Sequence, residues 1–259
     1  MNAARTTGPV RVVGTGLLGT SIGLGLTALG IDVILANRSP AALRLAIDYG
    51  AGRAEAEGDA PEIVVVAVSP DSTAALVAAE LEAHPDALVT DVASVKGAIL
   101  DELRERGADV SRYLGSHPMA GRERGGAMSA RADLFLGRPW VLTPHDGSTP
   151  AQFFALENLA VDLGAVPVRF TPDEHDRGVA LISHVPQVVA SLLAARLVGA
   201  PDAVPALAGQ GLRDTTRIAA SDPELWIQIL GANAAPVRES LRAFRDDLDG
   251  VIAALDDPE

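Results

Sequence analysis

Short apolar runs alternate with longer amphipathic segments through the first two thirds of the chain, and this alternation restricts the fold more than any other feature. The apolar runs cover residues 10–13, 33–36, 63–68, 88–92, 140–142 and 166–170. Each run is nearly continuous in Val, Ile, Leu or Ala, as expected for strands whose two faces are both covered by helices. The segments between the runs then act as crossover helices, so the pattern predicts a mostly parallel sheet.

The pattern changes after residue 170, where apolar residues recur only at helical spacing. Thr171, Pro172 and Glu174 form a capping-box pattern with proline at the first helical position. A second, all-helical domain is therefore expected to begin near Thr171. Its most apolar stretch, residues 178–199, is long enough to cross a bilayer, but the polar residues and the proline inside it favour a helix buried in a protein interface.

Charge and composition narrow the class of partner. The formal charge of −13 at pH 7 opposes non-specific attraction to nucleic acid or to an anionic membrane. The chain contains no Cys, which excludes disulfides and thiolate metal sites, and residues 1–8 lack the apolar core of a signal peptide. We therefore expect a cytoplasmic protein that acts on a small molecule.

A glycine-rich loop directly follows the first predicted strand and opens a helix. It has the GxGxxG spacing of dinucleotide-binding loops, in the sequence Gly14-Thr15-Gly16-Leu17-Leu18-Gly19. The first glycine permits a tight turn, the second lets the backbone approach a pyrophosphate, and the third lets the helix pack closely on the strand. We predict an α/β fold with a Rossmann-type dinucleotide-binding domain at residues 1–171 and an all-helical domain at residues 172–259.

The end of the second strand bears on the choice of nicotinamide cofactor. NAD sites usually place Asp or Glu here to hold the ribose diol, but this chain has Asn37, Arg38 and Ser39. Asn removes the repulsion that a carboxylate would exert on a 2′-phosphate, and the side chains of Arg38 and Ser39 could bind that phosphate. The segment therefore favours NADP and leaves NAD and dual use open. Arg38 could equally stack on adenine or face solvent. Ser69 and Pro70, after the third strand, lie where loops of such folds line the cofactor cleft, unless Pro70 simply ends the strand.

Two further motifs carry a resemblance to a known family. Residues 91–97 read Asp-Val-Ala-Ser-Val-Lys-Gly and close the fourth strand, and residues 115–121 read Gly-Ser-His-Pro-Met-Ala-Gly and close a fifth, both at the edge where ligands bind. Together with the glycine loop and with segments 173–177, 183–187, 211–219 and 221–226, they resemble the prephenate and arogenate dehydrogenases. The resemblance runs in order along nearly the whole chain.

The resemblance implies an NAD(P)-dependent oxidoreductase of tyrosine biosynthesis that oxidatively decarboxylates prephenate to 4-hydroxyphenylpyruvate. Arogenate and a 4-amino analogue of prephenate are the alternative substrates. The resemblance also implies that the helical domain binds substrate and forms a homodimer.

By this resemblance, His117 is the catalytic histidine, which takes the proton of the substrate hydroxyl while hydride leaves toward nicotinamide. Imidazole has a reference pKa of about 6.5 and suits that role near neutral pH. Ser94 matches the serine that orients the histidine. Arg217 matches the substrate-binding arginine, whose guanidinium can grip a carboxylate through two parallel hydrogen bonds. Arg213, one helical turn earlier, is either a second such residue or the ion-pair partner of Asp214.

The remaining site candidates also follow from the resemblance. His184 matches a substrate-pocket histidine, with a buried core residue as the alternative. Many members that use prephenate carry a second His where this chain has Gln187, so the choice of substrate stays open. Glu123 matches a position near the pocket, and Arg122 beside it could supply a further carboxylate contact. Trp226 matches an aromatic residue that family members contribute across the dimer interface, with packing inside one chain as the alternative.

An acidic patch around His175 suggests a metal site at first sight. Asp173, Glu174 and Asp176 surround this histidine in the sequence. Acidic residues also stabilise the first turn of a helix, and the implied chemistry needs no metal. Capping of the helix is therefore favoured over metal binding.

Two other classes of protein share the glycine loop. A β-hydroxyacid dehydrogenase generally uses a lysine from its helical domain, and no Lys follows Lys96 here. A regulatory protein that only senses NADP needs the glycine loop but has no use for His117, Ser94 and Arg217 together. Both classes are therefore disfavoured.

Overall fold

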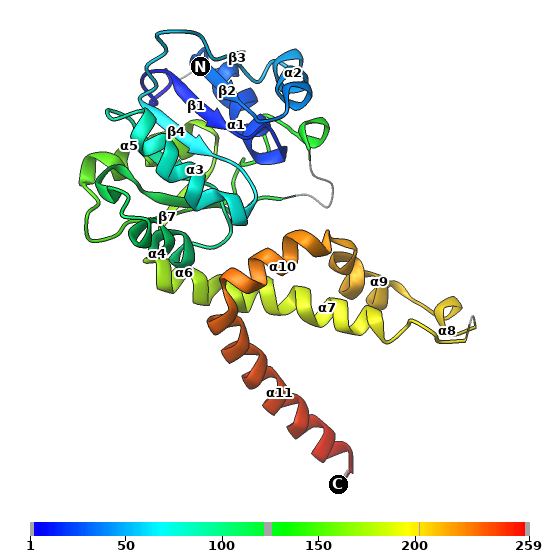
Figure 1. The fold of residues 1–259 in the computed structure, drawn as a ribbon. Coiled ribbons are helices and arrows are strands. Elements are labelled where there is room, and N and C mark those ends of the chain that lie inside the picture. Colours follow the sequence, from blue (N-terminus) through cyan, green and yellow to red (C-terminus); the bar gives the residue numbers. More distant parts are fainter. Residues whose placement is uncertain (1–2, 122–125, 202, 257–259) are drawn as a thin grey trace. The chain divides into compact units, whose positions relative to one another are not determined.

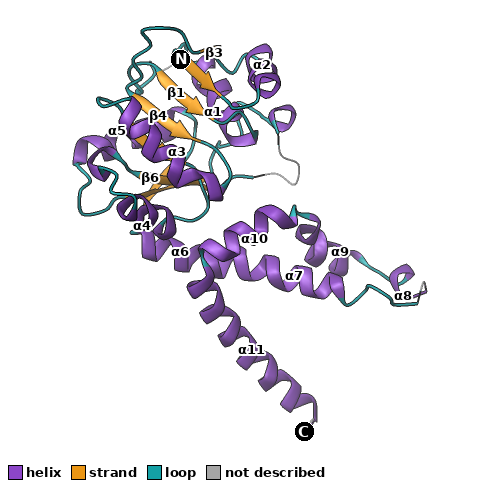
Figure 2. Ribbon diagram, viewed as in Figure 1, coloured by secondary structure: helices purple, strands orange, loops and turns teal. Residues whose placement is uncertain are grey.

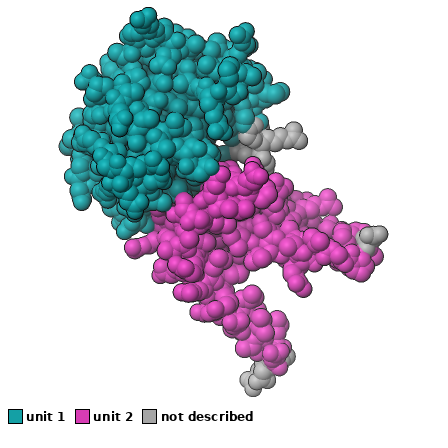
Figure 3. Space-filling model, in the orientation of Figure 1, with its two compact units in different colours: residues 1–175 teal, residues 176–259 magenta. Residues whose placement is uncertain are grey.

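The computed structural model describes residues 3–121, 126–201 and 203–256. The chain divides into two compact units, Met1–His175 and Asp176–Glu259, which Figure 3 shows in separate colours.

The first unit is built on a five-stranded parallel sheet with the strand order β3-β2-β1-β4-β5 (Figures 1 and 2). Its strands are β1 (Val10–Val13), β2 (Val33–Ala36), β3 (Arg53–Ala54), β4 (Ile63–Val66) and β5 (Leu88–Asp91). Its helices are α1 (Leu17–Ala28), α2 (Pro40–Asp48), α3 (Pro70–Ala83) and α4 (Gly97–Glu105). The predicted Rossmann-type sheet is confirmed, with the short β3 added. The chain order reverses between β1 and β4, and sheets of this kind bind ligands beside the loops that follow two such strands.

A second sheet of three strands completes the first unit. It contains β6 (Gly115–Pro118), β7 (Pro139–Thr143) and β8 (Val166–Arg169), and α5 (Pro150–Asp162) joins the last two. β6 and β7 are antiparallel, whereas β7 and β8 are parallel. The sequence placed the histidine motif at the end of a fifth strand of one sheet, but the motif itself forms β6 in this second sheet. Gly, Ser, His and Pro form no apolar run, and pairing with the apolar strand β7 is what extends them.

Alternate residues of the parallel strands serve two different faces of the sheet. Val10 and Val12 of β1 belong to the main core cluster, together with residues of α1. Arg11, between them, faces α3, where its Nε donates to Glu80 Oε2 at 2.8 Å. Trp140 of β7 belongs to the same cluster as the two valines, so the two sheets share one core.

The second unit is helical wherever the described residues have regular structure. A continuous helical segment consists of α6 (Pro172–Val179), whose first turn belongs to the first unit, a π-helical turn at Ala180–His184, and α7 (Val185–Ala195). It is followed by α8 (Ala203–Ala206), α9 (Gln210–Thr216), a 3-10 turn at Arg217–Ala220, α10 (Pro223–Ala232) and α11 (Ala234–Asp256). The predicted capping box is present: Glu174 Oε2 accepts from Thr171 N at 2.8 Å, and Glu174 N donates to Thr171 Oγ1 at 3.2 Å.

The helical segment Pro172–Ala195 is long and apolar enough to cross a membrane, with a mean hydropathy of 1.6 over a window that is 33% buried. Two of its polar side chains, Gln187 and His184, nevertheless have partners within the helical unit. Gln187 Nε2 donates to Ile218 O at 3.0 Å, and His184 Nδ1 lies 3.1 Å from Asn233 Nδ2. Such contacts are typical of a helix packed inside a protein.

Candidate active site

The glycine loop has the geometry that a dinucleotide requires. Gly14 has a φ of +100°, and a Cβ there would lie 2.3 Å from the carbonyl oxygen of Ala67. A Cβ on Gly19 would lie 1.9 Å from the Gly14 oxygen, whereas a Cβ on Gly16 would meet nothing within 4 Å. Gly14 and Gly19 are therefore required for packing, and the space beside Gly16, at the N-terminus of α1, can admit a pyrophosphate.

The segment after β2 combines structural contacts with one exposed cation. Asn37 uses both ends of its amide: Nδ2 donates to Thr15 Oγ1 at 2.6 Å, and Oδ1 accepts from Ser39 N at 2.8 Å. Ser39 caps α2, because its Oγ accepts from Ala42 N at 3.3 Å. Asn37 thus contacts Thr15 of the glycine loop, and Ser39 caps the N-terminus of α2. Arg38, between them, is exposed.

Ser69 and Pro70 lie in the loop after β4, which touches the glycine loop through Ala67. β4 already ends at Val66 and Pro70 is the first residue of α3, so the alternative that Pro70 ends the strand is wrong. Ser69 Oγ donates to Asp71 Oδ1 at 2.6 Å. This hydrogen bond holds the pKa of the Asp71 carboxyl below its usual value.

The two predicted catalytic residues lie on segments that a buried ion pair connects. Ser94 is partly buried in the loop after β5, and His117 is partly buried on β6. Lys96 forms an ion pair with Asp91 at the end of β5 and donates from Nζ to Ser116 O at 2.7 Å. Because Ser116 directly precedes His117, Lys96 links β6, which carries His117, to the loop after β5, which carries Ser94.

This ion pair is excluded from solvent. The side chains of Lys96 and Asp91 are 1% and 0% exposed, and Asp91 also accepts from Tyr113 Oη at 2.6 Å and from Ala93 N at 2.8 Å. Lys96 is the only lysine in a chain that otherwise uses arginine. The sequence interpretation gave neither Lys96 nor Asp91 a role, and the single lysine was the signal that could have drawn attention to this pair.

His175 contacts the predicted catalytic histidine. Its Nε2 lies 2.9 Å from His117 Nδ1, and the two rings meet edge to face with their centroids 5.1 Å apart. His175 is 2% exposed and lies in the first turn of α6. The sequence assigned it only to a capping patch, because the two histidines are 58 positions apart and no local pattern links them. Among the described residues, no group of three or more His, Cys, Asp or Glu side chains is arranged to hold a metal ion.

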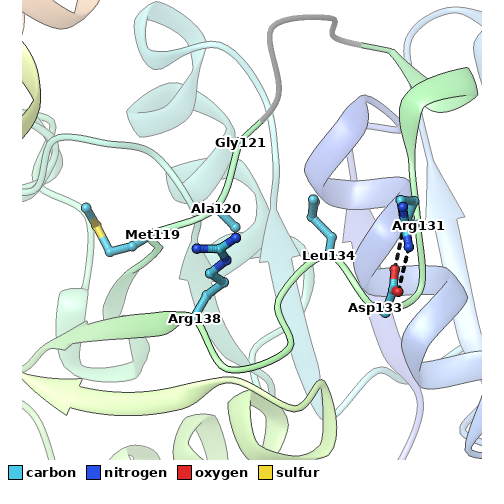
Figure 4. A pocket seen from close by; sticks show the side chains of 7 residues that line it. All are labelled: Met119, Ala120, Gly121, Arg131, Asp133, Leu134 and Arg138. Carbon is cyan, nitrogen blue, oxygen red and sulfur yellow. Dashed lines mark hydrogen bonds and ion pairs between the residues drawn. The ribbon is translucent and has the colours of Figure 1, made fainter. Parts of the chain in front are cut away.

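A cavity of about 400 Å³ adjoins the end of β6 (Figure 4). It is lined by Met119, Ala120, Gly121, Arg131, Asp133, Leu134 and Arg138. Arg131 forms a two-point ion pair with Asp133, at 2.8 and 2.7 Å, and Figure 4 shows Arg138 reaching toward Ala120. The sequence did not single out these two arginines. The predicted pocket residues Arg122 and Glu123 lie outside the described residues.

In the second unit, His184 and Trp226 pack together. His184 is 1% exposed in the π-helical turn, and its ring meets Trp226 edge to face with the centroids 5.9 Å apart. Its Nδ1 lies 3.1 Å from Asn233 Nδ2, which also donates to Asp176 O at 2.7 Å. These contacts hold the His184 ring in one orientation, within a kind of helical turn that often occurs at functional sites.

Arg217 opens the 3-10 turn after α9 and is exposed. The amide of Gln187 donates to Ile218 O at 3.0 Å, so α7 fixes the segment that carries Arg217. Arg213 donates to a backbone carbonyl at 3.3 Å. Asp214 accepts from a glutamine amide at 2.7 Å instead of from Arg213, so the ion pair that the sequence left open does not form here.

The parallel sheet, the glycine loop and the helical second unit define a two-domain nicotinamide-dependent dehydrogenase. Two family models match the chain: the nucleotide-binding domain of prephenate dehydrogenase over residues 23–169, and its dimerization domain over residues 171–259. The chain belongs to the prephenate dehydrogenase family and is an NAD(P)-dependent oxidoreductase. The nucleotide-binding match begins after the glycine loop, so the assignment of that loop rests on its geometry.

Individual proteins agree with the family match. The chain is 38% identical to the probable prephenate dehydrogenase NovF of Streptomyces niveus, over 94% of this chain and 68% of the relative. Among solved structures, prephenate dehydrogenase from A. aeolicus in complex with hydroxyphenyl propionate and NAD+ has a TM-score of 0.88 at 25% identity, over 96% of this chain and 91% of that one. Synechocystis arogenate dehydrogenase has a TM-score of 0.82 at 29% identity, over 96% and 92%.

Proposed function

We propose that this chain catalyses the oxidative decarboxylation of prephenate to 4-hydroxyphenylpyruvate, with NAD(P) as the hydride acceptor. The family match supports the class of reaction, and the relative NovF supports prephenate as the substrate. The single observation that carries the chemistry is the His117 imidazole, which is held through Nδ1 on a strand that ends beside the cavity of Figure 4. Histidine is the side chain that most often moves protons in enzymes.

Cofactor binding and the transfer of the hydroxyl proton each have a group in this chain. The loop Gly14–Gly19 would hold the cofactor, whose chemistry is to accept hydride from the ring carbon that bears the hydroxyl. His117 takes the hydroxyl proton as the carbon–oxygen double bond forms, with Ser94 orienting the reacting groups. The bond to the ring carboxylate then breaks, its electrons complete the aromatic ring, and carbon dioxide leaves. The oxygen takes a proton back from His117 to form the phenol, which restores the histidine.

Prephenate carries two carboxylates, so a protein with a formal charge of −13 must place cations at its site. We assign Arg217 to one carboxylate, because a guanidinium can donate two parallel hydrogen bonds to it. Arg213 is the weaker candidate for the same role. The other proposed pocket residues are His184, Gln187, Trp226, Arg122 and Glu123.

Arogenate is the second candidate substrate. Synechocystis arogenate dehydrogenase is similar in fold to this chain. The neutral amide of Gln187 holds a side-chain carboxylate less strongly than a cationic imidazole would, and it tolerates the ammonium group of arogenate. A 4-amino analogue of prephenate, which differs at the ring hydroxyl, is a further candidate.

We also propose that the enzyme prefers NADP. Arg38 is exposed at the end of β2, and no carboxylate occupies the neighbouring positions 37 and 39. Asn37 is engaged with Thr15 and Ser39, so it adds no negative charge that would repel a 2′-phosphate. A guanidinium is suited to phosphate because its donors match the phosphate oxygens in pairs.

A cytoplasmic homodimer formed through the helical domain completes the proposal. The family's matching domain is a dimerization domain. α11 exposes Phe244, Leu248, Val251 and Leu255, which recur at spacings of three and four along one helical face. A second copy of the chain would bury this face.

A two-by-two assay of prephenate and arogenate against NAD and NADP tests the proposed function. We expect reduction of the cofactor together with release of carbon dioxide, most rapidly with prephenate and NADP. A lack of turnover in every combination would contradict the enzyme assignment, and binding of NADP without turnover would favour the alternative of a regulatory protein that senses NADP.

A further inference from the structure

We propose that His175 is a positioning residue that sets the tautomer of His117. The inference rests on the proposed role of His117 as the proton acceptor and extends that role to a second residue. It is carried by the contact between His117 Nδ1 and His175 Nε2, which are 2.9 Å apart in the first unit.

The contact admits two hydrogen-bonding patterns when both rings are neutral. A neutral imidazole carries hydrogen on one nitrogen and accepts on the other, so one atom of this pair must donate to its partner. If His117 Nδ1 donates, the lone pair of His117 lies on Nε2, which can then take the substrate proton. If His175 Nε2 donates, the hydrogen of His117 lies on Nε2 and blocks that role. Only the pattern in which His175 accepts is productive.

Contacts within the first unit fix the position of His175. It is 2% exposed, and the capping box of Thr171 and Glu174 fixes the turn of α6 on which it lies. A hydrogen bond to one ring nitrogen decides which tautomer a histidine adopts. A buried His175 whose Nε2 accepts from Nδ1 would therefore prepare His117 before the substrate arrives.

A histidine in this place also suits the charge of the substrate. In Ser-His-Asp enzymes a carboxylate accepts from the equivalent nitrogen of the catalytic histidine. A neutral imidazole supplies the same acceptor without adding negative charge beside a substrate that carries two carboxylates. This difference gives a physical reason for a histidine at position 175.

Replacement of His175 by leucine removes the acceptor while keeping the site apolar and filled. We expect kcat to fall about 10–100-fold with little change in KM, because the tautomer matters when the proton moves and not when the substrate binds. His175→Gln keeps an acceptor oxygen near the place of Nε2 and should recover much of the loss. His145→Leu is the matched control: it removes a partly buried histidine of the same unit, bonded to Tyr113 O at 3.0 Å, and should leave kcat unchanged.

A double-mutant cycle separates positioning from general support of the fold. If His175 acts through His117, His175→Leu lowers kcat in the wild-type background but has no further effect in the His117→Asn background. An equal loss of kcat in both backgrounds would show that His175 only supports the fold and would overturn the proposal.

The tautomer itself is measurable from the ¹⁵N chemical shifts of the imidazole nitrogens, since the chain has five histidines. At a pH where both rings are neutral, we expect His117 to carry hydrogen on Nδ1, and to shift toward the other tautomer in His175→Leu. Hydrogen on Nε2 of His117 in the wild-type protein would overturn the proposal even in an active enzyme. An absence of turnover with prephenate and arogenate would instead contradict the proposed function. The chemical shifts would still show which nitrogen of His117 carries hydrogen, and so would test the role of His175 separately.

Discussion

Replacement of Lys96 by methionine should destabilise the first unit by about 3–5 kcal/mol, the range found when one partner of a buried ion pair is removed. The substitution leaves the Asp91 carboxylate, which is 0% exposed, without its ammonium partner. Tyr113 Oη and Ala93 N still donate to Asp91 at 2.6 and 2.8 Å, which compensates part of the buried charge. We therefore expect a loss near the lower end, about 3 kcal/mol, which is a fall of roughly 150-fold in the folding constant.

Urea unfolding followed by tryptophan fluorescence measures this loss. The two units need not unfold together, so the measurement uses a Trp226→Phe background, in which Trp140, 1% exposed in β7, reports on the first unit alone. Arg106→Met is the matched control. It removes an exposed ion pair with Glu102 in α4 and should change the free energy of unfolding by less than about 1 kcal/mol.

The partner residue provides a further check on the same reasoning. Lys96→Met combined with Asp91→Asn should lower the free energy of unfolding by less than the sum of the two single changes. The second change removes the charge that the first leaves unpaired. If Lys96→Met lowers the free energy of unfolding by no more than the control Arg106→Met does, the claim that this ion pair holds the loop after β5 to β6 would be refuted.

The remaining predictions concern turnover and specificity. His117→Asn should lower kcat by about 100–10,000-fold with little effect on KM, as expected for removal of a general base, and a retained rate would make His117 structural. Arg217→Gln should raise the KM for prephenate about tenfold or more, because hydrogen bonds to charged groups contribute about 1.5–3 kcal/mol, and an unchanged KM would contradict its carboxylate role. Arg38→Ala should raise the KM for NADP much more than the KM for NAD, and equal effects on both would place Arg38 away from the 2′-phosphate. Gln187→His should increase the ratio of kcat/KM for prephenate to that for arogenate, and a decrease would contradict the proposed basis of substrate choice.

Local patterns were sufficient to predict the parallel sheet and the start of the helical segment. The apolar runs at 10–13 and 33–36 match β1 and β2 residue for residue, since strands covered on both faces are apolar throughout. The capping box at Thr171 and Glu174 is equally local, because both of its hydrogen bonds join residues three positions apart. The glycine loop was predictable because Gly14 and Gly19 leave no room for a Cβ in the turn and in the helix that follows, while Gly16 keeps the space beside the N-terminus of α1 open.

Contacts between distant segments were not predictable from these patterns. β6 contains Gly, Ser, His and Pro, and it becomes a strand only through its partner β7. The pairing of His117 with His175 depends on how α6 packs near β6, which no periodicity encodes. The same holds for the bond from Lys96 to Ser116 O, which joins residues 20 positions apart. The most informative features of the candidate site therefore arise from tertiary packing.

The central claim is that His117 of the first unit and Arg217 of the second act on one substrate molecule beside the nicotinamide. A crystal structure of the enzyme with NADP and 4-hydroxyphenylpyruvate tests it most directly. We predict that the phenol oxygen lies within about 3.2 Å of His117 Nε2, the reach of a hydrogen bond, and that the carboxylate lies against the guanidinium of Arg217 from the same chain or from the partner subunit. A ligand bound away from His117, or an Arg217 directed away from the ligand in both subunits, would contradict the account.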